Sequence, residues 1–192
     1  MKRHTHIIYV PGLGDRYDPL RRACLWLWRL YGVRVTMVPM QWTRDEEYVD
    51  KRMRVEKMLA EVVSERVVLV GESAGGSMAL SVYATHTNVV AGAMTLCGKN
   101  TRSDNVAPRI YARNPAFRES MLQAESSVRA LSKVQRGKFV SVVPLYDPTV
   151  PVQQTLIPDC QKMTLLAVGH LLSILAMLTI YGPLVTRRAK KL

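Results

Sequence analysis

The chain has 192 residues and a formal net charge of +12. This length suits one domain, which should bury about 70% of the surface that its unfolded chain exposes. The basic residues are dispersed and accompany no zinc-finger spacing or RNA-binding motif, so the composition does not favour a specific nucleic-acid partner. Three scattered cysteines argue against a disulfide framework or a metal site, and the apolar run 7–10 is too short for a signal peptide. These features favour a cytoplasmic protein.

Six apolar runs alternate with helical patterns along the chain. Such alternation indicates right-handed crossovers between parallel strands, with helices on both faces of one sheet. We therefore expect a three-layer α/β/α sandwich with a mostly parallel sheet of about six strands. The runs span about residues 6–10, 33–38, 66–70, 89–96, 138–144 and 162–168.

The first strand ends in a turn that contains Gly12 and Gly14, and two helices are predicted between this turn and the third strand. The first helix begins at Asp18 and stops at Gly32, a residue typical of helix ends. The second helix covers about residues 44–65. Its inward face is predicted from apolar residues at helical spacing: Val49, Met53, Leu59 and Val63.

The third apolar run breaks into a glycine-rich turn around Ser73. Residues 71–76 read Gly-Glu-Ser-Ala-Gly-Gly and lead into helix-forming sequence. A nucleophile elbow needs this strand, turn and helix, because the sharp turn strains the serine backbone and exposes its oxygen. Side chains two positions away would collide, so Gly71 and Gly75 suit the flanking positions. Ser73 is the predicted nucleophile; the alternative is a phosphate-binding turn, although no Gly-Lys-Ser/Thr follows.

The last two strands end at an acid and at a histidine, in the chain order that such a triad requires. Asp147 follows the fifth run and His170 follows the sixth, so we predict them as the acid and the base. Asp104, after the fourth run, is the competing acid, and Asp147 could instead cap a short helix that begins at Pro148. His170 could instead be a core histidine. Glu72, beside Ser73, either orients the site or fills a variable position of the elbow.

The elbow, the Asp-x-x-Val-Pro string at 147–151 and the Gly-His pair at 169–170 resemble the α/β-hydrolase family. The resemblance covers nearly all of the chain and implies a trimmed α/β-hydrolase fold with strand order 2-1-3-4-5-6. In that order the turn after the first strand faces the elbow, so the amides of Leu13 and Ala74 are the expected oxyanion hole. One departure is the end of the first strand, Tyr-Val-Pro-Gly-Leu-Gly, where many members carry His-Gly.

The segment 98–137 is a predicted short, lid-like insertion within a single domain of residues 1–192. It begins with polar residues and then contains one predicted helix, 115–134. Because the insertion is short, we expect a shallow or open site.

The C-terminal stretch 163–185 is apolar enough to suggest a membrane span with a basic flank. Against this, Gly169-His170 divides the stretch, and Gly182-Pro183 ends the helix that follows. We therefore expect a buried strand and a closing helix, with membrane contact only through the basic tail.

These features predict a serine hydrolase that cleaves small carboxylic esters or thioesters through an acyl-enzyme on Ser73. No cofactor and no metal are expected, and the predicted partner is a small ester. Lys99, Arg102 and Arg16 either favour anionic substrates or belong to the solvated surface. The alternatives are a non-catalytic α/β-hydrolase-like binding protein and a membrane-associated interaction protein.

Overall fold

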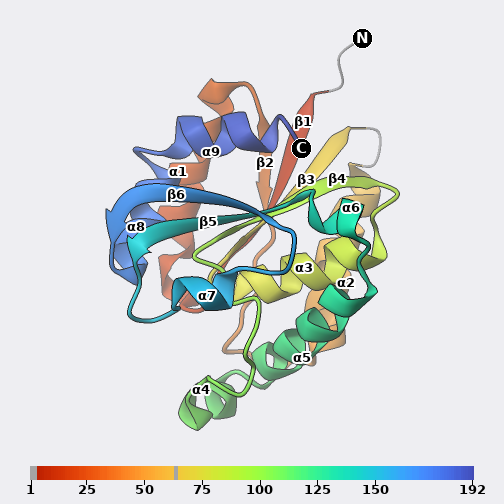
Figure 1. Cartoon of the computed structure of the whole chain (residues 1–192), viewed down its shortest axis with the longest axis vertical. Helices are drawn as coiled ribbons and strands as arrows, with labels where there is room; N and C mark the ends of the chain where they lie inside the picture. Colours follow the sequence, from red (N-terminus) through yellow and green to blue (C-terminus); the bar gives the residue numbers. More distant parts are fainter. Residues whose placement is uncertain (1–3, 63–64) are drawn as a thin grey trace.

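The computed structural model describes residues 4–62 and 65–192, and a six-stranded sheet forms its centre (Figure 1). The strands pair in the order β2-β1-β3-β4-β5-β6, and every neighbouring pair is parallel. The predicted strands, their order and the parallel sheet are confirmed. The strand bounds are β1 Thr5–Val10, β2 Arg34–Met37, β3 Arg66–Glu72, β4 Val90–Leu96, β5 Phe139–Tyr146 and β6 Gln161–Val168.

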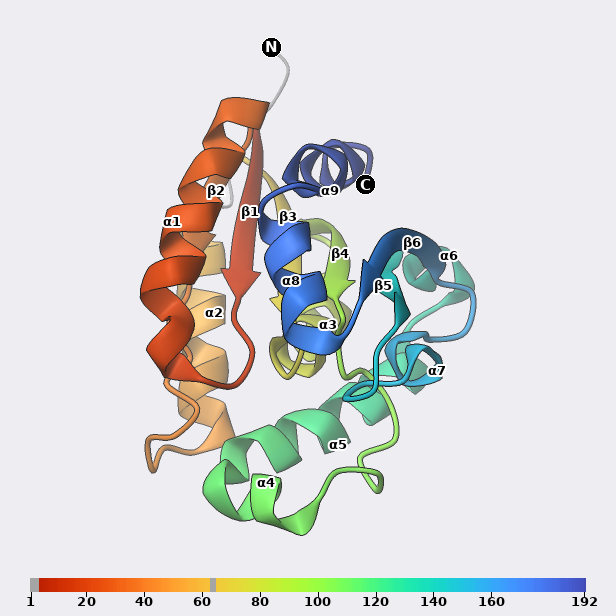
Figure 2. The ribbon, with the colours of Figure 1, turned by 90° about the vertical axis from the view of Figure 1, so that its left-hand side faces the viewer.

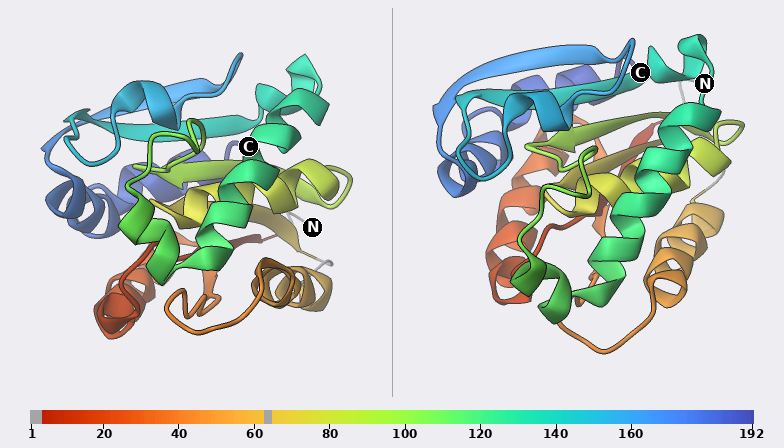
Figure 3. Two further views of the ribbon diagram at one scale, coloured as in Figure 1. Left: turned by 90° about the horizontal axis from the view of Figure 1, so that it is seen from below. Right: turned by 60° about the horizontal axis from the view of Figure 1, so that its bottom comes forward.

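Helices cover both faces of the sheet, which makes the predicted α/β/α sandwich (Figure 3). Successive strand residues point to opposite faces, so Ile8 and Leu69 enter one core and Ile7 and Val68 enter the other. The first core is covered by α2 (Tyr48–Glu61), α3 (Gly75–Thr85) and α5 (Pro115–Ala130). The second is covered by α1 (Asp18–Trp28), α8 (His170–Leu178) and α9 (Gly182–Ala189).

The predicted inward face of α2 is wrong at two positions. Val49 and Met53 are exposed by 54% and 51%, whereas Tyr48, Lys51, Val55 and Leu59 are buried. The helix turns Lys51 toward the core, because the Lys51 ammonium donates hydrogen bonds to the carbonyl oxygens of Met40 and Gln41. These bonds stabilise a buried charge that would otherwise be expected in solvent. Val63 lies outside the described residues.

The segment between β4 and β5 contains three helices, where one was predicted (Figure 2). The long helix α5 packs against α3 and buries Phe117 and Met121 in the core of that face. Most of the segment that was predicted as a lid is therefore part of the helical layer. That the polar loop and α4 act as a lid stays a prediction. The short helices are α4 Pro108–Arg113, α6 Lys133–Arg136 and, between β5 and β6, α7 Val152–Thr155.

The C-terminal segment forms a strand, β6, but the expectation that it is buried is wrong: β6 is the edge strand of the sheet, and only Leu165 in it is buried. Two helices follow it, where one was expected. Gly182 and Pro183 begin α9, and α8 has already ended at Leu178. Proline suits the first helical turn, where its missing N–H is not needed. Among the described residues no single helix is long and apolar enough to cross a membrane; α8 and α9 reach that length and composition only together, across a bend of 70°.

Candidate active site

Ser73 lies in a sharp turn between β3 and α3. Its φ is +47°, a left-handed conformation that is strained for a residue with a side chain. Two glycines make the turn possible: a Cβ on Gly71 would lie 2.4 Å from the carbonyl oxygen of Gly75, and a Cβ on Gly75 would lie 2.2 Å from that of Val10. The turn therefore has the backbone geometry predicted for a nucleophile elbow.

The structure brings Ser73, His170 and Asp147 together in one hydrogen-bonded chain. Ser73 Oγ lies 2.8 Å from His170 Nε2, and His170 Nδ1 lies 2.6 Å from Asp147 Oδ2. The serine and the histidine are each partly exposed, whereas Asp147 is only 4% exposed. A ligand can therefore reach the hydroxyl while the acid stays protected from solvent.

Asp147 also accepts hydrogen bonds from the backbone of its own turn. Its Oδ1 lies 2.9 Å from the amide nitrogens of both Thr149 and Val150. The prediction of a helix that begins at Pro148 is wrong, since α7 starts at Val152 and Asp147 binds the amides of a turn instead. Burial raises the pKa of Asp147, but the His170 ring and these amides outweigh burial and hold the pKa below its usual value. The competing acid, Asp104, pairs with Arg102 at the exposed surface.

The turn after β1 lies directly against the elbow, as predicted. A Cβ on Gly12 would come within 2.9 Å of Ser73 Cβ. Among the described residues, neither the Leu13 amide nor the Ala74 amide donates a hydrogen bond to another protein group. Both amides therefore remain available for a negatively charged oxygen bound near Ser73.

A buried arginine joins this turn to the elbow. Arg21 Nη2 lies 2.6 Å from Oε1 of Glu72, the residue before Ser73, and Arg21 also donates to the carbonyl oxygens of Leu13 (3.1 Å) and Gly14 (2.9 Å). Arg21 is 5% exposed and Glu72 is 2% exposed. Burial acts to lower the pKa of Arg21, but the bond and the charge of Glu72 raise it above its usual value.

Sequence reasoning did not single out Arg21. The available signal was Glu72 itself, because a carboxylate between an apolar strand and a nucleophile needs a buried cation. Glu72 has a further partner, because the hydroxyl of Tyr9 on β1 donates a hydrogen bond to it.

Comparison with known proteins identifies the fold. No family model and no curated protein matches the sequence. Three of the similar solved structures are a chain reported with the metagenome-derived lipolytic enzymes LipS and LipT, the Paleococcus ferrophilus monoacylglycerol lipase, and MGS-MChE2, an alpha/beta hydrolase enzyme from the metagenome of lagoon sediments. Their TM-scores are 0.69, 0.65 and 0.63, at 11%, 14% and 16% identity. The matches cover 100%, 100% and 99% of this chain and 94%, 97% and 92% of the others. The chain has the α/β-hydrolase fold.

In this α/β-hydrolase fold the carboxyl ends of the strands gather the polar groups of the site. β3 ends at the elbow, β5 ends just before Asp147, and β6 ends just before Gly169 and His170. Gly169 has a φ of +82°, which suits glycine and turns the chain from β6 into α8. The three side chains thus meet because neighbouring parallel strands end at the same edge.

The other histidines and the basic residues considered from the sequence have different surroundings. His6 is bound by Glu65 and Thr36 at the start of the sheet. Lys99 is buried and donates to Gln154 and to the Asn105 carbonyl oxygen, so it does not offer a free cation to a substrate.

Of the remaining basic residues, Arg102 pairs with Asp104, and Arg16 stacks on Tyr17 at 4.8 Å from the ring centre.

One group of side chains has the spacing of a metal site. The ligand atoms of Cys97, Asp147 and His170 all lie within 4.8 Å of one another. Burial, and then the negative charge of Asp147, raises the pKa of the Cys97 thiol. Metals bind the thiolate, so this environment disfavours metal binding. In addition, His170 is already hydrogen-bonded to Ser73 and to Asp147.

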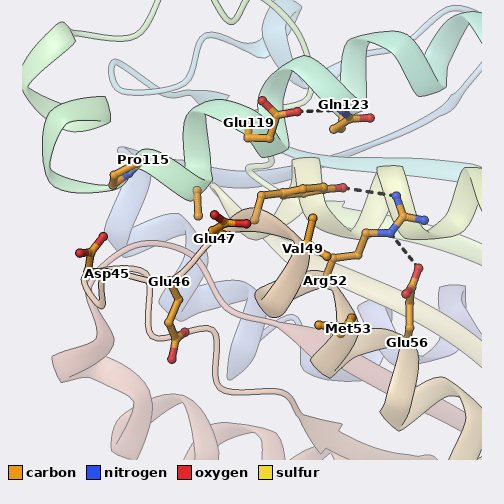
Figure 4. Close-up of a pocket in the computed structure, with 12 residues that line it drawn as sticks. Asp45, Glu46, Glu47, Val49, Arg52, Met53, Glu56, Pro115, Glu119 and Gln123 are labelled. Atoms are coloured by element: carbon orange, nitrogen blue, oxygen red, sulfur yellow. Dashed lines mark hydrogen bonds and ion pairs between the residues drawn. The ribbon is translucent and has the colours of Figure 1, made fainter.

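A large hollow lies away from Ser73, His170 and Asp147. It has a volume of about 870 Å³ and lies between the start of α2 and the start of α5 (Figure 4). Its acidic side chains are partly engaged by neighbours, since Glu46 binds Lys51 and Arg54, and Glu56 binds Arg52. The lining includes neither a triad residue nor a residue of the turn after β1, so we assign no reaction to it.

Proposed function

We propose that the protein is a serine hydrolase that cleaves small carboxylic esters or thioesters through an acyl-enzyme on Ser73. The observation that supports the proposal is the continuous chain of hydrogen bonds from Ser73 Oγ through His170 to Asp147. The fold hosts many reactions, so the site carries the proposal and the fold does not. The similar structures include lipolytic enzymes and a monoacylglycerol lipase, which agrees with an ester substrate.

In the first half of the reaction, Ser73 Oγ attacks the carbonyl carbon of the ester and its proton passes to His170 Nε2. The carbonyl oxygen becomes negatively charged and accepts hydrogen bonds from the amides of Leu13 and Ala74. Asp147 holds the proton on Nδ1, which leaves Nε2 free to act as the base, and it stabilises the charged ring. The carbon–oxygen bond to the alcohol then breaks, and His170 returns the proton to the departing oxygen.

In the second half, water takes the place of the alcohol. His170 removes a proton from the water, the resulting hydroxyl adds to the acyl carbon, and the bond to Ser73 Oγ breaks. The proton returns to the serine and the free acid leaves. The partial exposure of Ser73 and His170 lets this water reach the acyl group.

The test is labelling of the purified protein with a fluorophosphonate, in which Ser73 Oγ attacks phosphorus and displaces fluoride. We expect one label per chain, located on Ser73 by mass spectrometry. Ser73→Ala should remove the label, and His170→Ala should slow labelling by several orders of magnitude. Asp104→Asn is the matched control, because this aspartate pairs with Arg102 at the surface and forms no bond to Ser73, His170 or Asp147.

A panel of short-chain esters and thioesters then gives the substrate class. Absence of label on a folded wild-type sample would contradict the proposal and favour a binding protein. Label on a residue other than Ser73, or labelling that does not depend on His170, would contradict the assigned roles.

A further inference from the structure

An exposed apolar groove lies beside the proposed base. It is formed by α1 and α8, which lie on the same face of the sheet (Figure 2). Its volume is about 190 Å³. We call it the leucine groove after four of its lining side chains, which are 52%, 61%, 71% and 40% exposed. These are Leu20, Leu171, Leu172 and Leu175.

Helix α8 is apolar on both of its sides. It buries Ile174, Met177 and Leu178 toward the sheet, while its outer side carries the leucines of the groove. A helix on the surface of a water-soluble domain ordinarily turns charged or polar residues outward. The apolar surface also continues past the end of α8, since Ile180 is 77% exposed and Leu184 on α9 is 46% exposed.

Positively charged side chains lie at two places beside this surface. Residues 160–192 contain five lysines and arginines and no aspartate or glutamate. On α9, Arg187 follows Leu184 by three residues, which places both on the same side of the helix. Lys191 comes two residues after the end of α9, and both Arg187 and Lys191 are exposed. At the other end of the groove, Arg16 stacks on Tyr17, which lines the groove.

We propose that the leucine groove and these cations form a docking surface for an anionic lipid membrane. A lipid membrane suits both parts of this surface. The exposed leucines can be buried among acyl chains, and anionic headgroups attract Arg16, Arg187 and Lys191. A second copy of the chain fits less well, since each copy carries a net charge of +12 and the cations adjoin the apolar surface. The docking does not depend on the proposed hydrolase activity, although it would bring His170, the first residue of α8, close to lipid esters.

The experiment is flotation of the full chain with vesicles. We expect the protein to float with mixed phosphatidylcholine and phosphatidylglycerol vesicles at low salt and to bind pure phosphatidylcholine much more weakly. Because salt screens surface charges, binding to the mixed vesicles should weaken when the ionic strength rises to about 1 M. The same result is expected for Ser73→Ala, which separates docking from catalysis.

Matched substitutions locate the surface. Leu172→Gln and Ile180→Gln should each weaken binding by about tenfold, because each removes one side chain that lipid would bury. Val134→Gln is the control, since Val134 is 73% exposed but lies on α6, away from the groove. Arg187→Glu with Lys191→Glu should weaken binding by at least about fivefold for each cation, whereas Arg129→Glu on α5 should not. Circular dichroism melting shows that each variant is folded.

Three results would overturn the proposal. The first is a wild-type protein that does not float with the mixed vesicles or binds pure phosphatidylcholine equally well. The second is full binding by folded Leu172→Gln or Ile180→Gln, or an equal loss with Val134→Gln. The third is a dimer in sedimentation that Leu172→Gln dissociates, which would assign the surface to a second copy.

Discussion

Replacing Arg21 should separate the stability of the site from its activity. Arg21→Met keeps much of the side-chain volume but removes the cation that accompanies Glu72. Glu72 is 2% exposed and would then be a buried carboxylate with only the Tyr9 hydroxyl as a partner. Breaking a buried ion pair from one side costs about 3–5 kcal/mol, which is a large share of the stability of a small domain.

The double variant Arg21→Met with Glu72→Gln removes both charges. Replacement of a whole buried pair is often nearly neutral, so the double variant should recover most of the lost free energy of unfolding. It does not recover the bonds from Arg21 to the carbonyl oxygens of Leu13 and Gly14. The turn that carries the proposed oxyanion amide stays untethered, and kcat should stay lower by up to about a hundredfold with little change in KM.

Urea denaturation followed by circular dichroism gives the free energies of unfolding, and hydrolysis of the best ester from the panel gives the rates. If Arg21→Met has the same free energy of unfolding as the wild type, the argument from the buried charge is refuted. A wild-type kcat in the double variant would refute the argument that Arg21 positions the turn. Arg22→Met, one residue further along α1 and exposed, is the matched control for both measurements.

Three further predictions follow from other contacts. Gly75→Ala should abolish folding or destabilise the protein by at least about 3 kcal/mol in a melting experiment, because its Cβ would lie 2.2 Å from the backbone oxygen of Val10; a stable, active variant would contradict the close packing of the elbow. Burial lowers the pKa of Lys99 to about 8, so above that pH the unfolded chain binds more protons than the folded chain. The free energy of unfolding of the wild type should therefore rise between about pH 8 and pH 10 by about 1–3 kcal/mol relative to that of Lys99→Met. Parallel pH profiles of the two proteins would contradict this prediction. Asp147→Asn should lower kcat by about four orders of magnitude in the ester assay, whereas Asp104→Asn should leave kcat unchanged; equal effects would exclude the assigned acid.

The parts of the site that could be predicted from the sequence are those that depend on local pattern and chain order. Gly71, Ser73 and Gly75 lie within a few residues of one another, so their spacing, together with the apolar run before them and the helix-forming sequence after them, indicates the turn. Asp147 and His170 each follow an apolar run, and parallel strands bring such positions to one edge of the sheet.

The parts that could not be predicted are buried charges with distant partners. Arg21 meets a carboxylate 51 residues away in the sequence, and Lys51 on α2 is turned inward by backbone carbonyl oxygens before the helix. Arginine and lysine are ordinarily exposed, so helical spacing gives no sign of either contact. The start of α9 at Gly182 was missed for another reason, because a Gly-Pro pair can end one helix or begin the next.

The strained turn at Ser73 makes the reactivity of this residue a reporter of folding. A left-handed residue with a side chain costs about 1–3 kcal/mol and persists only where the surrounding structure holds it. Here the support is non-local: the Ser73 amide donates to Leu96 on β4, Gly12 lies against Ser73, and Gly75 lies against the end of β1. A chain that has formed β3 and α3 alone has none of these contacts. The reactivity of Ser73 should therefore appear in one step with the assembly of the central strands, and a probe that reacts with it would count native molecules during refolding.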